Sequence, residues 1–265
     1  MSRRRGRALP LALGVAGALA LAVLIVLPLL ALVIRAPWGE AIDVLTTEEV
    51  RDALGLSLIV SLWALGLAVL FGFPMAWVLA RSTFPGRSLL RALVLLPMVV
   101  PPVIGGVALL VAFGRRGVIG QHLDEWFDVR LAYTRTAAIL AATFVSLPFF
   151  VVTVEAALRG GDRRYEDAAR TLGASPGFVL RHITLPSIRG AIGAGAALAW
   201  ARALGEFGAT VTFAGSFAGT TQTMPLAIYD LLDSDVHAAI LLSLLLLAVS
   251  VAVLALLRDR WLGAP

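Results

Sequence analysis

The sequence of 265 residues contains no cysteine and no lysine. Without cysteine the chain cannot form disulfide bonds or thiolate metal sites, and cysteine usage gives no indication of the redox compartment. Without lysine it cannot contain a nucleotide-binding loop of the form G-x4-G-K-[ST], because that loop needs its lysine to contact the phosphates. The 22 basic residues are all arginine. An ATP site of this kind is therefore excluded.

Catalytic patterns are missing as well. The three histidines, His122, His182 and His237, lie in loops or at the ends of apolar runs, far apart in the sequence. Neither H-E-x-x-H nor G-x-S-x-G occurs. We therefore predict no catalytic residue and no metal ligand in this chain, which argues against an intramembrane enzyme.

Apolar residues make up 59% of the chain and form six long runs. The runs cover roughly 9–34, 54–80, 89–113, 137–158, 190–213 and 237–257. Each has at least about twenty residues, which is enough to cross a hydrocarbon core of about 30 Å. The first run is too long for the apolar part of a signal peptide, so we expect it to be retained as a helix. The predicted fold class is an all-α polytopic membrane protein with six transmembrane helices.

The arginines are distributed unevenly between the two sides of the predicted membrane. With the N-terminus inside, fifteen arginines fall in inner segments and six in outer segments, while Arg202 lies within a run. Cytoplasmic loops carry an excess of basic residues, so we predict that both termini and the loop 159–189 are cytoplasmic. The basic composition then reflects orientation in the membrane, and no nucleic acid partner is predicted.

The outer segments are acidic. They contain eleven aspartates and glutamates against six arginines, a net charge of −5. This surface would not attract free anions. It is either a set of ordinary solvated loops or part of a docking surface for an extracytoplasmic binding protein.

A polar loop lies between the fourth and fifth runs. Its spacing is D-A-A-x3-G-x9-I-x-L-P, beginning at Asp167. Asp162 can cap a helix over 163–172, within which Glu166 precedes Arg170 in the order that favours an ion pair. Gly173 then stands where a helix needs a left-handed residue to end.

A second, short helix is predicted after this turn, over roughly 176–184. Ser175 can act as its N-cap with Pro176 in the first position, and Pro186 indicates its end. Its apolar face would consist of Phe178, Val179, His182 and Ile183. Such a short helix is unstable alone, so it packs either on the spans of this chain or in a groove of another subunit.

Two features of the predicted membrane part point to a pathway. Pro97, Pro101 and Pro102 lie within the third run, which predicts either a kinked helix or an unwound segment bordering the pathway. Arg202 and Glu206 lie one turn apart in the fifth run, where they either pair with each other or serve in the pathway or gate.

One further acid, Glu155, lies near the inner end of the fourth run. We expect it to face the aqueous boundary.

The loop spacing resembles the "EAA" motif of the membrane subunits of ABC importers. In that family the loop is bound by a separate ATPase subunit. Asp167 stands where that family usually has glutamate, so the acid is retained with one methylene fewer. Three further segments are similar to the molybdate permeases among type I importers. They are F-G-R-R-G-V-I-G at 113–120, A-W-A-R-A-L-G-E-F-G-A-T at 199–210 and T-Q-T-M-P-L-A-I-Y at 221–229. The likeness covers roughly residues 50–257.

The resemblance implies the type I ABC importer permease fold, in a bacterial plasma membrane, and inward movement of molybdate by alternating access. It implies a homodimer surrounded by membrane lipid, a dimer of ABC ATPase subunits below it and an extracytoplasmic molybdate-binding protein above. The partner then binds and hydrolyses ATP, and this chain holds no cofactor. The residues expected to couple the chain to the ATPase are Glu166, Asp167, Ala168, Ala169, Gly173, Phe178, Ile183, Leu185 and Pro186; the pathway candidates are Arg202, Glu206, Pro101 and Pro102.

The predicted organisation has three parts: a first helix and outer loop at 1–53, a transmembrane domain at 54–257 and a cytoplasmic tail at 258–265. Two alternatives remain open. The same fold could carry sulfate, thiosulfate, tungstate or a polyamine. A secondary transporter would need binding and gating in one chain and often has two similar halves, but the sequence shows no clear repeat.

Overall fold

The structure is a computed structural model that describes residues 5–262. Every regular element in this range is a helix. The long helices are α1 (Arg5–Arg35), α3 (Glu48–Arg81), α7 (Arg135–Gly160), α10 (Leu185–Leu204) and α13 (Val236–Leu262). The shorter ones are η1 (Trp38–Glu40), α2 (Ala41–Leu45), α4 (Arg87–Val99), α5 (Pro102–Phe113), α6 (Gly120–Phe127), α8 (Arg164–Thr171), α9 (Pro176–Val179), η2 (Leu180–Thr184), α11 (Gly208–Phe213) and α12 (Met224–Leu231).

The six predicted spans all fall on these helices, which confirms the all-α polytopic fold. Three helical stretches are long and apolar enough to cross a membrane, namely Gly17–Arg35 of α1, α3 and α7. The last span begins with the apolar stretch Val236–Ala252 of α13. This helix continues to Leu262. The end of the predicted tail, 263–265, lies outside the described residues.

The third predicted span is not one kinked helix. It consists of α4 and α5, which meet at an angle of 117°. Val100 and Pro101, between them, are both extended, with ψ values of 130° and 133°. A residue before proline is disfavoured in the helical region, and each of these two residues precedes a proline. The consecutive prolines therefore end α4 and restart the chain as α5.

The fifth predicted span is also interrupted. The helix begins at Leu185, before the expected start, and α10 ends at Leu204. Gly205 follows, and α11 then starts at Gly208. Both helices that contain pathway candidates are thus broken within the apolar part of the chain.

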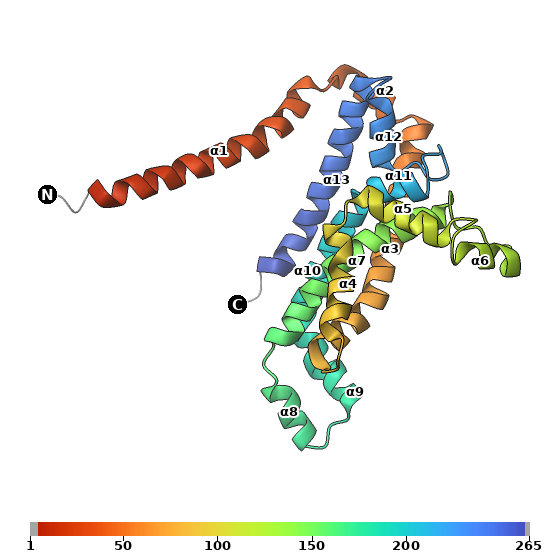
Figure 1. Ribbon diagram of the computed structural model, residues 1–265. Helices are drawn as coiled ribbons and strands as arrows, with labels where there is room; N and C mark the ends of the chain where they lie inside the picture. The colour runs from red at the N-terminus through yellow and green to blue at the C-terminus, as the bar shows by residue number, and fades with distance from the viewer. Residues whose placement is uncertain (1–4, 263–265) are drawn as a thin grey trace.

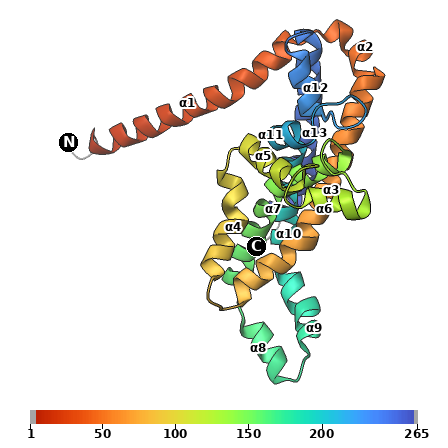
Figure 2. The same cartoon turned by 45° about the vertical axis from the view of Figure 1, so that its right-hand side comes forward.

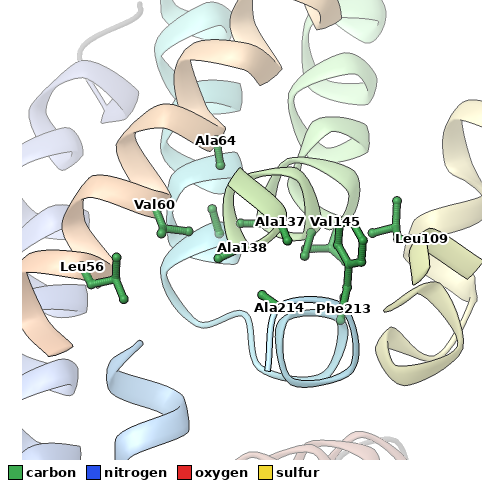
Figure 3. Packing of buried hydrophobic residues seen from close by; sticks show 13 residues of the cluster. Leu56, Val60, Ala64, Leu109, Ala137, Ala138, Val145, Phe213 and Ala214 are labelled. Carbon is green, nitrogen blue, oxygen red and sulfur yellow. The ribbon is translucent and has the colours of Figure 1, made fainter. Parts of the chain in front are cut away.

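The centre of the molecule is formed by α3, α7 and α10, which lie side by side in both views (Figures 1 and 2). Their contact surfaces include many small residues, which allow the backbones to approach closely. Fully buried alanines at the centre include Ala64 and Ala68 of α3 and Ala138 and Ala141 of α7. Figure 3 shows one such cluster, in which Phe213 of α11 fills the space beside α7.

The α8–α9 hairpin and helix α1 extend from this centre (Figure 1). Helices α8 and α9 project from one end of the bundle, and α2 and α12 lie at the opposite end (Figure 1). Helix α1 leads away from the bundle, and its apolar side chains between Gly17 and Arg35 are nearly all exposed. A bilayer can cover such a helix because lipid tails are as apolar as its side chains.

Candidate coupling loop and pathway residues

The first helix of the polar loop ends as the sequence predicts. Gly173 has a φ of +86°, in the left-handed region. Its N–H donates to the carbonyl of Arg170 at 2.9 Å, and the N–H of Ala174 donates to the carbonyl of Ala169 at 3.0 Å. These two bonds form a Schellman motif, which satisfies carbonyls that the helix end leaves free. At the other end of α8, Asp162 accepts a hydrogen bond from the N–H of Arg164 at 3.0 Å.

The second helix of the loop begins as predicted but ends elsewhere. Ser175 accepts a hydrogen bond from the N–H of Phe178 at 3.3 Å, with Pro176 in the first turn. The predicted end before Pro186 is wrong, because the chain stays helical through η2 and into α10. Here η2 is a π-helical turn, and Pro186 lies in the first turn of α10, where the missing N–H costs least.

The predicted apolar face of this helix is divided in the structure. Val179 is buried against the chain itself, while Phe178 remains 51% exposed. The rings of Phe178 and His182 stack with their centres 4.3 Å apart. Ile183 is half-buried. The short helix thus packs on its own chain with one face and presents an aromatic pair to the outside with another.

The two neighbouring acids of the loop have opposite surroundings. The side chain of Asp167 is 67% exposed, and its nearest basic partner is Arg170 at 3.6 Å. The side chain of Glu166 is 7% exposed and lies 2.6 Å from Arg81 of α3. Ala168 is exposed and Ala169 is half-buried. The exposed acid and the small residues beside it leave room for a partner to approach.

Sequence reasoning missed two partners of Glu166. It predicted the ion pair with Arg170, whose guanidinium lies 3.9 Å away. The shorter contacts are with Arg81 and with the hydroxyl of Thr184, which donates to Oε1 at 3.0 Å. Arg81 precedes Glu166 by 85 residues. No local spacing relates two residues so far apart, so this contact could not have been read from the sequence.

The charged pair of the fifth span does form. Nη1 of Arg202 lies 2.6 Å from Oε2 of Glu206, whose side chain is 2% exposed. The other oxygen, Oε1, accepts a hydrogen bond from the N–H of Ala209 at 2.6 Å. Glu206 therefore joins the end of α10 to the start of α11 across the break at Gly205. This pairing leaves a role in the pathway open.

The structure brings the two broken spans together. A methyl group added at Gly208 would lie 2.9 Å from Cβ of Pro102, and one at Gly106 would lie 2.7 Å from the carbonyl oxygen of Ala209. The start of α11 thus packs directly against α5, beside the carboxylate of Glu206. Pro101 and Pro102 themselves are exposed on the chain. The pathway candidates from the third and fifth spans therefore lie in one region.

The prediction for Glu155 is wrong. Its side chain is 1% exposed and does not face the aqueous boundary. It lies 3.0 Å from Arg159 of the same helix and 3.3 Å from Arg91 of α4. A buried carboxylate requires such partners, and the arginine of α4 was too distant in sequence to suggest one.

Part of the acidic surface that is predicted to lie outside the membrane is neutralised within the chain. Asp124 of α6 accepts hydrogen bonds from Arg130 at 2.9 Å and Arg115 at 3.0 Å. The hydrogen bond from Arg130, followed by that from Arg115, holds the pKa of Asp124 below its usual range. This acid therefore stabilises the fold of the loop 114–134 through its contacts with two arginines.

Residues 68–263 match the family described as binding-protein-dependent transport system inner membrane component. The chain belongs to this family. The molybdenum transport system permease protein ModB of Mycobacterium tuberculosis is 47% identical to it over 231 residues, which cover 87% of each chain. The sulfate transport system permease protein CysT of Salmonella typhimurium is 38% identical over 235 residues, which cover 87% of this chain and 84% of that protein.

A solved structure supports the fold of this family member. The chain superposes with a TM-score of 0.74 on a chain of a bacterial ABC transporter involved in the import of the acidic polysaccharide alginate, at 19% identity. The superposition covers 97% of this chain and 94% of the other. The architecture is therefore the ABC importer permease fold, in a multi-pass inner-membrane subunit.

Proposed function

We propose that this chain is the membrane-spanning subunit of an ATP-driven importer of molybdate. The observation that carries this proposal is the loop between α7 and α10. It projects from the bundle, it is internally capped at both helices, and it presents Asp167 and Phe178 outward. An exposed hairpin of this kind offers a surface to which a partner subunit can bind.

The choice of cargo rests on the relatives. Identity to the molybdenum transport permease is 47%, against 38% for the sulfate transport permease over a similar length. Sulfate is the second candidate because it is a tetrahedral dianion of the same kind. Specificity in this proposal resides mainly in the extracytoplasmic binding protein, so the permease needs no dense cluster of basic residues.

The mechanism is alternating access in a homodimer of this chain. Two ATPase subunits bind the exposed loops from the cytoplasm, and closure of the ATPase dimer on ATP moves both loops. The helices connected to the loops then open the pathway outward, where the binding protein delivers the anion. Arg202 and Glu206, beside the junction of α5 and α11, are the pathway residues that we favour.

The test is uptake of radiolabelled molybdate into vesicles that contain this chain, its neighbouring ATPase and its binding protein. We expect uptake that requires ATP hydrolysis and persists in excess unlabelled sulfate. Vesicles supplied with a non-hydrolysable ATP analogue are the control. Sulfate uptake in place of molybdate would retain the importer and reject the cargo. Anion uptake without the ATPase would reject the importer and favour a secondary transporter.

A further inference from the structure

The carboxylate of Glu166 is the most enclosed charged group of the polar loop. It lies in the first turn of α8, and its side chain is 7% exposed. Three groups from three different elements converge on it. They are Nη2 of Arg81 at 2.6 Å, the hydroxyl of Thr184 at 3.0 Å and Nη2 of Arg170 at 3.9 Å.

Arg81, which provides the shortest of these contacts, is itself held in place. Its guanidinium lies 5.7 Å from the centre of the Trp77 ring on α3, and its side chain is 12% exposed. A guanidinium over the face of a tryptophan is attracted by the ring and loses freedom. The contact with Glu166 therefore joins α8 to a fixed point on the last turn of α3.

Helix α8 has few other connections to the bundle. It packs against α9 and the π-helical turn, which belong to the same projecting hairpin (Figure 2). Helix α3, in contrast, packs along α7 and α10 at the centre of the molecule. The hairpin is joined to α3 through the covalent chain and also directly, by the contact of Glu166 with Arg81.

We propose that Glu166 is a positioning residue that clasps the loop to α3, so that the loop and the end of α3 move as one body. This inference rests on the proposed function, in which a partner moves the loop. The two adjacent acids then have different roles. Asp167 is exposed toward the partner, and Glu166 binds Arg81 of its own chain.

A purely structural role does not account for this arrangement well. Burying an ion pair costs solvation free energy, and apolar residues of similar size often stabilise a fold equally well or better. The pair does supply a short, charge-assisted contact at 2.6 Å, which is stronger than a hydrogen bond between neutral groups. A strong contact between two elements favours their moving together.

The first test measures the distance between two spin labels, one on the loop and one on α3. Because the chain has no cysteine, the double variant Tyr165→Cys with Val78→Cys places labels at these two positions alone. Both side chains are exposed, at 71% and 37%. We expect the distance distribution to stay unchanged when the assembled complex binds ATP, and to broaden when Glu166→Gln is added. A shift on ATP binding in the otherwise native complex would overturn the clasp.

The second test is the number of anions taken up per ATP hydrolysed. Glu166→Gln retains shape but loses the charge, and we expect this ratio to fall about tenfold while hydrolysis continues, as for other residues that couple two sites. Asp162→Asn is the matched control. It removes the charge of an exposed carboxylate in the same loop but keeps an oxygen for the N–H of Arg164. An unchanged ratio in Glu166→Gln would reject the proposal.

A second variant and a second cargo cover the cases in which Glu166→Gln or molybdate cannot be used. If Glu166→Gln does not insert into the membrane, Thr184→Val removes one donor with little change in volume and should lower the ratio by a smaller factor. The label distance is also independent of the cargo. If the complex imports sulfate and not molybdate, only the cargo assignment fails, and the clasp is tested with sulfate.

Discussion

Gly173 shows how a single backbone conformation shapes the loop. Its positive φ allows the chain to reverse between α8 and α9, and both bonds of the Schellman motif depend on it. A side chain at this φ places its Cβ close to the backbone carbonyl, although nothing else in the structure lies near that position. The requirement for glycine is therefore conformational and not a matter of space.

We predict that Gly173→Ala destabilises the turn by about 1–2 kcal/mol. The chain should still insert into the membrane, but ATPase binding or the coupling of hydrolysis to uptake should be impaired. Co-purification of the ATPase and ATP-driven uptake measure the two effects. Gly160→Ala is the control, because that glycine has an ordinary φ and open space around it. Equal uptake by both variants would contradict the prediction.

Glu206 is the second residue whose chemistry can be tested alone. Glu206→Gln retains an oxygen for the N–H of Ala209 but loses the charge that faces Arg202. The charged contact beside the junction of α5 and α11 is then lost, so we expect uptake to fall while the subunits still assemble. Uptake assays with size-exclusion chromatography measure both. Full activity would leave the pair with no role in the pathway.

Among the elements, the junction of α5 and α11 depends on the absence of side chains. At Gly106 an added methyl group would overlap the hydroxyl of Thr212 and lie 2.9 Å from Cα of Ala209. These atoms of Ala209 belong to the backbone of α11, which cannot move aside as the end of a flexible side chain could. This close approach holds the two broken spans together beside Glu206.

Gly106→Ala should therefore separate α5 from α11. Overpacking of this kind costs about 1–3 kcal/mol. We expect a lower thermal unfolding temperature in detergent and reduced uptake. The matched substitution Gly66→Ala, on α3, meets no atom within 4 Å and should leave both quantities unchanged. The prediction fails if the two variants unfold at the same temperature.

At the scale of the whole molecule, the orientation in the membrane determines which partner meets which surface. The arginine distribution predicts that the α8–α9 hairpin lies inside and the loop 114–134 outside. The hairpin and this loop are both well exposed, as Tyr165 at 71% and Val118 at 70% illustrate. A partner that hydrolyses cytoplasmic ATP has to meet the first of these surfaces.

Single cysteines test this orientation directly, since the native chain has none. In intact cells we expect a membrane-impermeant maleimide to label Val118→Cys and not Tyr165→Cys. Permeabilised cells should label at both positions, which controls for accessibility. The reverse pattern would invert the topology and remove the loop from any cytoplasmic ATPase.

The sequence alone predicted the features that depend on neighbouring residues. Apolar length set the six spans, and the caps at Ser175 and Gly173 followed from the hydrogen-bonding needs of helix ends. The consecutive prolines at 101 and 102 also predicted an irregularity in the third helix. The pattern could not distinguish a kink from a 117° break, because the angle depends on what the second half packs against.

Only the tertiary structure decided which charges are buried and which helices meet. Glu166 and Asp167 are adjacent acids, yet one is enclosed by Arg81 and Thr184 and the other is exposed. Glu155 was expected at the aqueous boundary and is instead buried between two arginines. The physical reason is the same in each case: a side chain's surroundings are set by elements distant in sequence, and no local spacing encodes where those elements lie.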